Sequence, residues 1–217
     1  MKTADNEIEA DEENGRLISM VHWNPYRLQG RNFVWDSRYI VAVATRPEYR
    51  HQGRMAALLA DGFRRFEREN MPVVWLMPAD PAIYRPFDFR YVYARCHEQL
   101  PAAAEIEAEY GSGGTGFRIT PLRQEDREQT AASCNSLLRR TADLSALRSA
   151  SYLAMMQEEA EADGGGQALI RDSSGPVGIC SWWQSEGQTE IRELLLWKPA
   201  ADRRTRQLLI LALRRYL

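Results

Sequence analysis

The sequence is poor in cysteine, has almost no lysine and contains no long hydrophobic run. Its three cysteines, Cys96, Cys134 and Cys180, lie far apart, and none belongs to a Cys-x-x-Cys pair. This number and spacing argue against a disulfide framework and a zinc site, so we expect no metal and a reducing, cytoplasmic environment. No apolar segment approaches the roughly 18 residues that a membrane-spanning helix needs, so we expect no membrane partner.

The charge balance excludes a strong electrostatic field of either sign. The formal net charge is −2, and because nothing in it attracts polyanions we expect no nucleic-acid partner. All of the 28 basic residues except Lys2 and Lys198 are arginines, whose planar guanidinium groups suit bidentate contacts with phosphate or carboxylate. Acidic residues crowd the run from Asp5 to Glu13, which predicts a solvated, disordered leader over residues 1–14.

The first half of the chain begins with strand patterns. Apolar residues over 15–28 and again from Phe33 flank the turn residues 29–32, which predicts an antiparallel hairpin. Residues 39–44 form an unbroken apolar run. This run predicts a strand at the centre of a sheet, covered on both faces.

A helix and a second buried strand follow. Residues 54–70 have apolar side chains at helical spacing and charged ones opposite, and residues 73–77 form a short apolar run. Together with residues 39–44 they predict a parallel strand–helix–strand crossover. A helical turn over 83–87 and a further strand over 91–100 are expected to complete this part.

The second half repeats the alternation after a break. Residues 101–116 end in a Gly-Ser-Gly-Gly-Thr-Gly run that predicts a linker between a first lobe, 15–100, and a second lobe, 117–217. The expected α/β fold thus has a mixed β-sheet flanked by helices in each lobe. The second lobe is expected to contain strands at 117–120, 167–171, 176–184 and 188–197 and helices at 125–141, 150–163 and from 200 onward.

The segment from Val41 to Leu59 has the pattern of an anion site. An apolar strand breaks into a turn that contains Arg50 and Gly53 and then opens an amphipathic helix. Backbone N–H groups in such a turn and at a helix N-terminus have no intrahelical acceptors, and the helix dipole adds a partial positive charge there. A phosphate or pyrophosphate group fits this place.

Two motifs carry a family resemblance. Val-Ala-Thr-x-Pro-x-Tyr-Arg-x-x-Gly at 43–53, followed by Ile-Tyr-x-x-Phe at 83–87, resembles the GNAT superfamily of N-acetyltransferases and, more narrowly, its Eis-like (enhanced intracellular survival) branch. The resemblance implies two tandem GNAT-like lobes, of which only the first binds acetyl-CoA as cosubstrate. It implies that the backbone of residues 43–45 pairs with the pantetheine arm and that residues 50–56 cradle the pyrophosphate. The cofactor-binding residues are then Val43, Ala44, Thr45, Arg50, His51, Gln52, Gly53, Arg54, Met55 and Ala56.

The sequence also departs from the family pattern. Met55 stands where the superfamily has Gly or Ala, and Phe87-Asp88-Phe89 replaces the usual Phe-Gly-aromatic sequence. Family members begin with a strand and two helices and end with a third domain, and none of these is expected here. We therefore expect a chain truncated at both ends, with both lobes incomplete.

The resemblance also implies a mechanism. A primary amine, either a small molecule or a lysine side chain, attacks the thioester directly, and Tyr84 gives a proton to the leaving thiolate. A backbone N–H near Val43 polarises the carbonyl group. No Cys/His pair supports a covalent intermediate.

Alternatives remain open at this point. Gly53 and Tyr84 also suit an ordinary turn and a packed ring, and Trp23 and Trp35 suit the core better than cation–π binding of an amine. One alternative function is a non-catalytic acyl-CoA-binding or regulatory module. Another is an interaction protein whose copies form a homo-oligomer.

Overall fold

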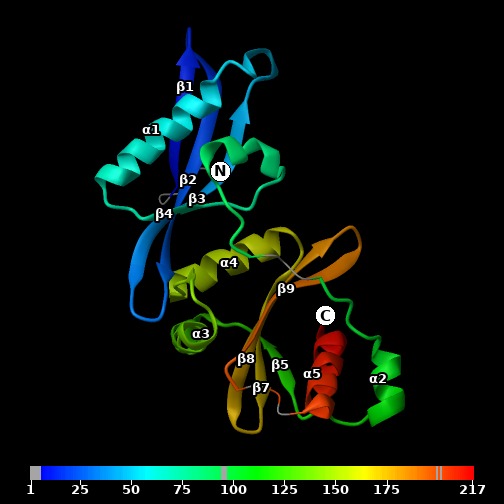
Figure 1. The fold of residues 1–217 in the computed structure, drawn as a ribbon. Coiled ribbons are helices and arrows are strands. Elements are labelled where there is room, and N and C mark those ends of the chain that lie inside the picture. The colour runs from blue at the N-terminus through cyan, green and yellow to red at the C-terminus, as the bar shows by residue number, and fades with distance from the viewer. Residues whose placement is uncertain (1–5, 94–96, 199, 201) are drawn as a thin grey trace. The chain divides into compact units, whose positions relative to one another are not determined.

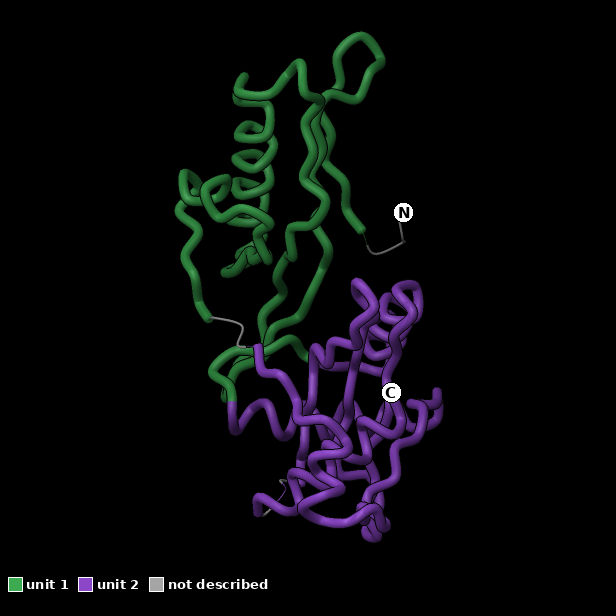
Figure 2. The backbone as a smooth tube through the Cα atoms, turned by 90° about the vertical axis from the view of Figure 1, so that its right-hand side faces the viewer, with its two compact units in different colours: residues 1–94, 142–147 green, residues 95–141, 148–217 purple. Residues whose placement is uncertain are grey.

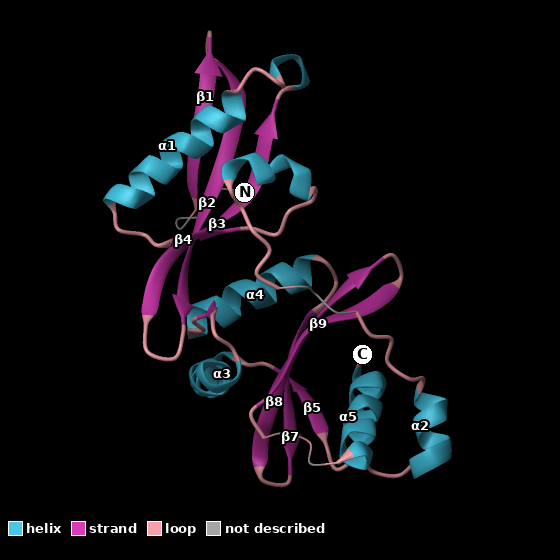
Figure 3. Cartoon of the chain, viewed as in Figure 1, coloured by secondary structure: helices cyan, strands magenta, loops and turns pink. Residues whose placement is uncertain are grey.

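The computed structural model describes residues 6–93, 97–198, 200 and 202–217. Figure 2 shows two compact units, one formed by residues 1–94 with 142–147 and the other by 95–141 with 148–217. Each unit contains a β-sheet flanked by helices (Figure 3), as the expected α/β fold requires. The two units are not continuous in sequence, because residues 142–147 belong to the first unit although they lie between segments of the second.

The first unit is built on one mixed sheet (Figure 1). β2 pairs antiparallel with both β1 and β3. β3 pairs in parallel with β4, and helix α1 connects these two strands. The expected hairpin, helix and crossover are all present. The bounds are β1 Glu7–Glu13, β2 Arg16–Gln29, β3 Val34–Thr45, α1 Arg54–Arg68, β4 Val73–Trp75 and a short β6 Ser145–Ala146 that pairs with β2.

The prediction of a disordered acidic leader is wrong for residues 7–13. These residues form β1, which pairs with β2 along its whole length. Glu7 forms ion pairs with Arg38 and Arg65, both at 2.7 Å, so its charge is not simply solvated. These arginines lie more than thirty residues away in sequence, so the composition of the acidic segment did not indicate them. Their positive charges lower the repulsion between the carboxylates of the strand.

Helix α1 packs on the sheet through aromatic side chains. Trp23 is fully buried and meets Phe66 edge to face at 4.9 Å between ring centroids. The structural role expected for Trp23 is confirmed, and its burial removes it as an amine-binding surface. Trp35 lies instead near the β2–β3 turn, where its ring stacks on Phe33 at 4.0 Å.

β3 occupies the expected central position but is not covered on both faces. From Val41 to Thr45 half-buried and exposed residues alternate, and Ala42 and Ala44 are the exposed ones. Ala42 also has φ of 50°, and the register with β2 shifts beside it, which marks a β-bulge. The continuous apolar run arose because small alanines occupy the open face.

The segment after β4 differs from the expected helix and strand. Two short 3-10 turns, Pro81–Ile83 and Arg85–Phe87, stand where one helical turn was predicted. Residues 91–93 and 97–100 form no strand, and residues 94–96 of that prediction lie outside the described part. The apolar residues of 91–93 are instead strongly exposed, Val92 by 85%.

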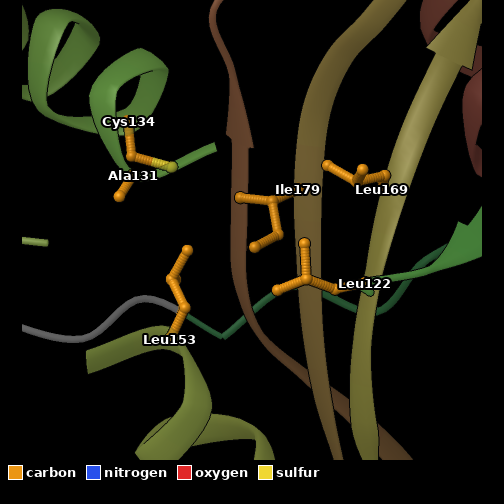
Figure 4. Packing of buried hydrophobic residues seen from close by; sticks show 6 residues of the cluster. All are labelled: Leu122, Ala131, Cys134, Leu153, Leu169 and Ile179. Carbon is orange, nitrogen blue, oxygen red and sulfur yellow. The ribbon is translucent and has the colours of Figure 1, made fainter. Parts of the chain in front are cut away.

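The second unit follows the predicted order closely. Its sheet has the order β5-β7-β8-β9, and the described pairs are all antiparallel, so only the first sheet is mixed. Figure 4 shows the core on one face of this sheet, where Leu153 and Cys134 meet Leu169 and Ile179. The elements are β5 Arg118–Pro121, α3 Arg127–Thr141, α4 Ala150–Ala162, β7 Gly166–Asp172, β8 Gly175–Ser185, β9 Gln188–Leu196 and α5 Arg203–Tyr216.

The predicted linker contains a helix. Residues Ala103–Tyr110 form α2, which lies beside α5 and buries Ile106 to 2% exposure. Arg215 of α5 contacts Glu107 at 2.8 Å and the carbonyl oxygen of Gly113 at 3.1 Å. The glycines that suggested a linker therefore form only the connection between α2 and β5.

Candidate functional site

The loop between β3 and α1 takes the shape that an anion site needs. After Thr45 the chain makes a 3-10 turn, Pro47–Tyr49, and then passes through two left-handed residues, His51 at φ 61° and Gly53 at φ 78°. Gly53 is the N-cap of α1, and no side chain caps this helix end. A glycine suits this position because an L-residue there is strained.

The N-terminus of α1 presents unpaired backbone donors. The first helical hydrogen bond runs from Ala57 N–H to the carbonyl oxygen of Gly53 at 2.9 Å, so the N–H groups of residues 54–56 precede the helical pattern. Residues 51–53 are exposed, which leaves this end open to solvent. The structure thus places residues 51–56 at the positive end of a helix dipole.

The end of β3 adds an open strand edge to this loop. β4 pairs with β3 only at residues 37–39, so within the described chain the edge of 40–45 that faces away from β2 has no strand partner. Arg46 N–H donates to the carbonyl oxygen of Ile18 on β2 at 2.9 Å. Because backbone groups alternate along a strand, Val43 and Thr45 direct theirs to the open edge. A ligand with amide groups can add there as an extra strand does.

The arginines of the loop have different surroundings. Arg50 is exposed, and its Nε donates to the carbonyl oxygen of Thr45 at 3.3 Å. Arg54, the first residue of α1, instead contacts Asp11 at 3.1 Å and Glu13 at 3.2 Å on β1. The sequence analysis did not predict these two contacts, because it expected residues 1–14 to be disordered and so to provide no fixed partner for Arg54.

Tyr84 lies at the junction of the two 3-10 turns. Its ring meets Phe89 edge to face at 5.8 Å between centroids, and Phe89 in turn lies 6.1 Å from Phe63 of α1. Burial raises the pKa of Tyr84 above its ordinary value. The phenol therefore stays protonated over the whole physiological range, as a proton donor must.

An aromatic cluster that the sequence analysis did not single out lies on the opposite face of the sheet. Arg38 faces α1, with its guanidinium 5.6 Å from the Phe66 ring, so alternation places Tyr39 on the other face. There Tyr39 meets Trp75 at 4.4 Å and Tyr26 at 5.8 Å between centroids. The β3–β4 pairing ends at Tyr39 and Trp75. This cluster of Tyr26, Tyr39 and Trp75 is thus next to the point where the two strands part.

The second unit has a differently built helix end at the corresponding place. α5 is capped by Asp202, whose carboxylate accepts from Thr205 N–H at 2.8 Å. This carboxylate occupies the donors that an anion would use and carries a like charge. That the second lobe has no phosphate site stays a prediction.

Neither described cysteine has the surroundings of a nucleophile. Cys134 and Cys180 are buried, and burial together with the charge of Glu193 raises the pKa of each to about 12. A thiol with so high a pKa is rarely the reactive thiolate. Cys96 lies outside the described residues.

The described part of the chain contains neither a metal-ligating cluster nor a helix that could span a membrane. None of its His, Cys, Asp and Glu side chains gather in a group of three that could hold a metal ion. None of its helices combines the length and the apolar character needed to cross a bilayer.

The first unit matches a known family model. Residues 4–92 match the model of the acetyltransferase (GNAT) domain, a span that includes β1 to β4, α1, the Arg/Gly turn and Tyr84. No curated protein matches the sequence. The family match supports acyl transfer as the general class of chemistry.

Solved structures of similar fold extend over both units. A probable N-acyltransferase of unknown function from Enterococcus faecalis V583 has a TM-score of 0.72 at 16% identity and covers 98% of this chain and 52% of its own. A GCN5-related N-acetyltransferase from Kribbella flavida has a TM-score of 0.64 at 17% sequence identity, and the match covers 95% of this chain and 50% of that protein. Eis1 from Mycobacterium abscessus has a TM-score of 0.59 at 13% sequence identity, and the match covers 93% of this chain and 52% of that protein. The chain spans about half the length of these proteins, with which it shares the fold.

Proposed function

We propose that this chain is an acetyl-CoA-dependent N-acetyltransferase that acts on a primary amine. The observation that carries the proposal is the open edge of β3, which a loop of residues 46–53 connects to the uncapped N-terminus of α1. Both features lie inside the segment that matches the acetyltransferase domain model. The narrower Eis-like assignment is part of the proposal and rests on the two sequence motifs.

The residues present fit the cofactor. The backbone groups of Val43 and the N–H of Thr45 at the open edge suit the amides of a pantetheine arm, and the turn at 51–53 with the N–H groups of residues 54–56 suits a pyrophosphate. Arg50 is an exposed cation beside them. Acetyl-CoA, when bound, supplies the thioester whose acetyl group is transferred.

The side chains and backbone then divide the chemistry. The N–H of Val43 donates to the reacting carbonyl oxygen, where negative charge develops as the neutral amine attacks. A C–N bond forms and the C–S bond breaks. Tyr84 passes its hydroxyl proton to the departing sulfur, the amine loses a proton to solvent, and Tyr84 takes a proton back from solvent.

The aromatic cluster suggests how the amine is held. Tyr26, Tyr39 and Trp75 present electron-rich ring faces, which attract ammonium groups. The cluster lies next to the point where β3 and β4 part, on the face opposite α1. We propose that the acceptor approaches from this face, in place of the route past Trp23 and Trp35 considered from sequence.

The proposal is tested by acetyl transfer to a panel of primary amines, measured as thiol release from acetyl-CoA. Tyr84→Phe is expected to lower kcat about 100-fold, the usual contribution of a positioned general acid, and to leave the affinity for CoA unchanged. Tyr91→Phe is the matched control, because Tyr91 lies in the same unit and is 70% exposed. Equal rates for wild type and Tyr84→Phe would exclude Tyr84 as the proton donor.

The same assay separates the alternative function. A non-catalytic acyl-CoA-binding module would bind CoA through the same loop and release no thiol with any amine. Amine-dependent thiol release above the rate of hydrolysis is the result that the enzyme proposal requires.

A further inference from the structure

One face of β1 is lined with carboxylates that reach arginines of α1. Glu7 contacts Arg65 at 2.7 Å, and Glu9 contacts the same guanidinium at 2.9 Å. Residues at alternate positions of a strand share a face, so Asp11 and Glu13 continue this row. The row therefore runs along α1 from its last turn to its first.

The row ends at the phosphate cradle. Asp11 contacts Nη1 of Arg54 at 3.1 Å, and Glu13 contacts Nη2 at 3.2 Å. Arg54 is also 5.8 Å from the ring of Tyr49, measured to the centroid, which holds the guanidinium from a second side. Both terminal nitrogens of the arginine that opens α1 are thus engaged by β1.

We infer that Asp11 and Glu13 are positioning residues that keep the side chain of Arg54 on β1 and thereby weaken the binding of polyanions at the α1 N-terminus. The inference rests on the proposed function, since it concerns the same loop. Arg54 contributes its backbone N–H to the cradle, while its side-chain charge is taken up by the two carboxylates. Arg46 and Arg50 are left as exposed arginines of the loop.

Charge counting gives the direction of the effect. Arg54 with its two partners carries a net charge of −1 next to a site that must accept phosphates. Neutralising both carboxylates changes this to +1 and frees the guanidinium to turn toward the ligand. Each charge is expected to change affinity about two- to threefold at low ionic strength, so the double substitution should tighten binding about fivefold.

A purely structural role predicts the opposite sign. If the ion pairs only fixed the first turn of α1, then removing them would loosen the cradle and weaken binding. The sign of the change in affinity therefore distinguishes an electrostatic role from a structural one. Salt provides a second distinction, because screening acts on the charge and not on the shape of the loop.

The test is calorimetric titration of the full chain with CoA at low and high salt. Wild type is compared with Asp11→Asn, Glu13→Gln and the double variant, with Glu12→Gln as control. Glu12 lies between the two residues on β1 and is exposed, whereas the described contacts of Arg54 with β1 go to Asp11 and Glu13. This control removes the same charge from the other face of the strand.

The expected result is about fivefold tighter binding by the double variant at low salt, a smaller gain at high salt, and less than a twofold change for Glu12→Gln. Unchanged or weaker binding by the double variant, or by both single variants if the double variant does not fold, overturns the inference and leaves the proposed function intact. Failure of wild type and every variant to bind CoA overturns the proposed function itself.

Discussion

Replacing Gly62 with alanine tests how helix α1 is held above the sheet. A Cβ atom at this position would lie 2.4 Å from Cζ2 and 3.0 Å from Cε2 of Trp23. Carbon atoms in contact normally lie about 3.5–4.0 Å apart, so the ring or the helix would have to move by about 1 Å. The absence of a side chain at Gly62 is what lets α1 approach Trp23 so closely.

The magnitude follows from two opposed effects. Alanine is the better helix former by about 1 kcal/mol, which alone would stabilise the variant. Overpacking costs about 1–3 kcal/mol, and the upper part of this range applies because Trp23 is fully buried between Phe66 and Phe63. We expect the free energy of unfolding to fall by about 1–2 kcal/mol.

The assay is urea unfolding followed by circular dichroism. Arg64 on the same helix provides the control, since its side chain is 66% exposed and the difference between Arg64→Ala and Arg64→Gly measures the helix propensity alone. A Gly62→Ala variant as stable as wild type, or more stable by the amount found at Arg64, would refute the close packing of α1 on Trp23.

Two further predictions concern charged groups. Burial acts to raise the pKa of Glu7, but hydrogen bonds from Arg65 and Arg38 outweigh it, so the pKa in the folded protein is lowered. The ionised Glu7 therefore stabilises the fold fully above the unfolded-state pKa of about 4.5, and this stabilisation is lost as the pH falls through the lower folded-state pKa. Glu7→Gln should therefore reduce stability at pH 7 by about 1 kcal/mol and flatten the acid limb of the stability–pH curve; an acid limb identical to that of wild type would contradict this. In the second unit, Arg148 pairs with Glu193 and is only 9% exposed, so Arg148→Leu should cost about 3–5 kcal/mol in thermal or urea unfolding. Replacing both partners with leucine should recover much of this loss, and a double variant no more stable than the single one would argue against an unpaired charge as the cause.

Local patterns predicted most elements of both units. The apolar spacing of residues 54–70 and the run at 73–77 correspond to α1 and β4, and the patterns of 167–197 correspond to β7, β8 and β9. These signals are local, because a helix or strand with one apolar face shows its period in its own sequence. The turn at Arg50 and Gly53 was recognisable for the same reason.

The errors arose where distant partners decide the structure. β1 forms because its carboxylates meet Arg38, Arg54 and Arg65, and α2 forms because Ile106 finds a place beside α5. Neither partner is visible in the segment itself, so composition alone suggested disorder and a linker. The open edge of β3 also depends on where β4 stops, which its apolar run from 73 to 77 did not reveal.

Amide chemical shifts recorded with and without CoA test the central claim most directly. The account predicts that CoA shifts the backbone resonances of residues 43–45 and 51–56, the open strand edge and the uncapped start of α1. Residues 202–206 at the capped start of α5 should stay unchanged and serve as the internal control. Unchanged resonances at 51–56 under saturating CoA, or shifts confined to the second unit, would contradict the proposed cofactor site.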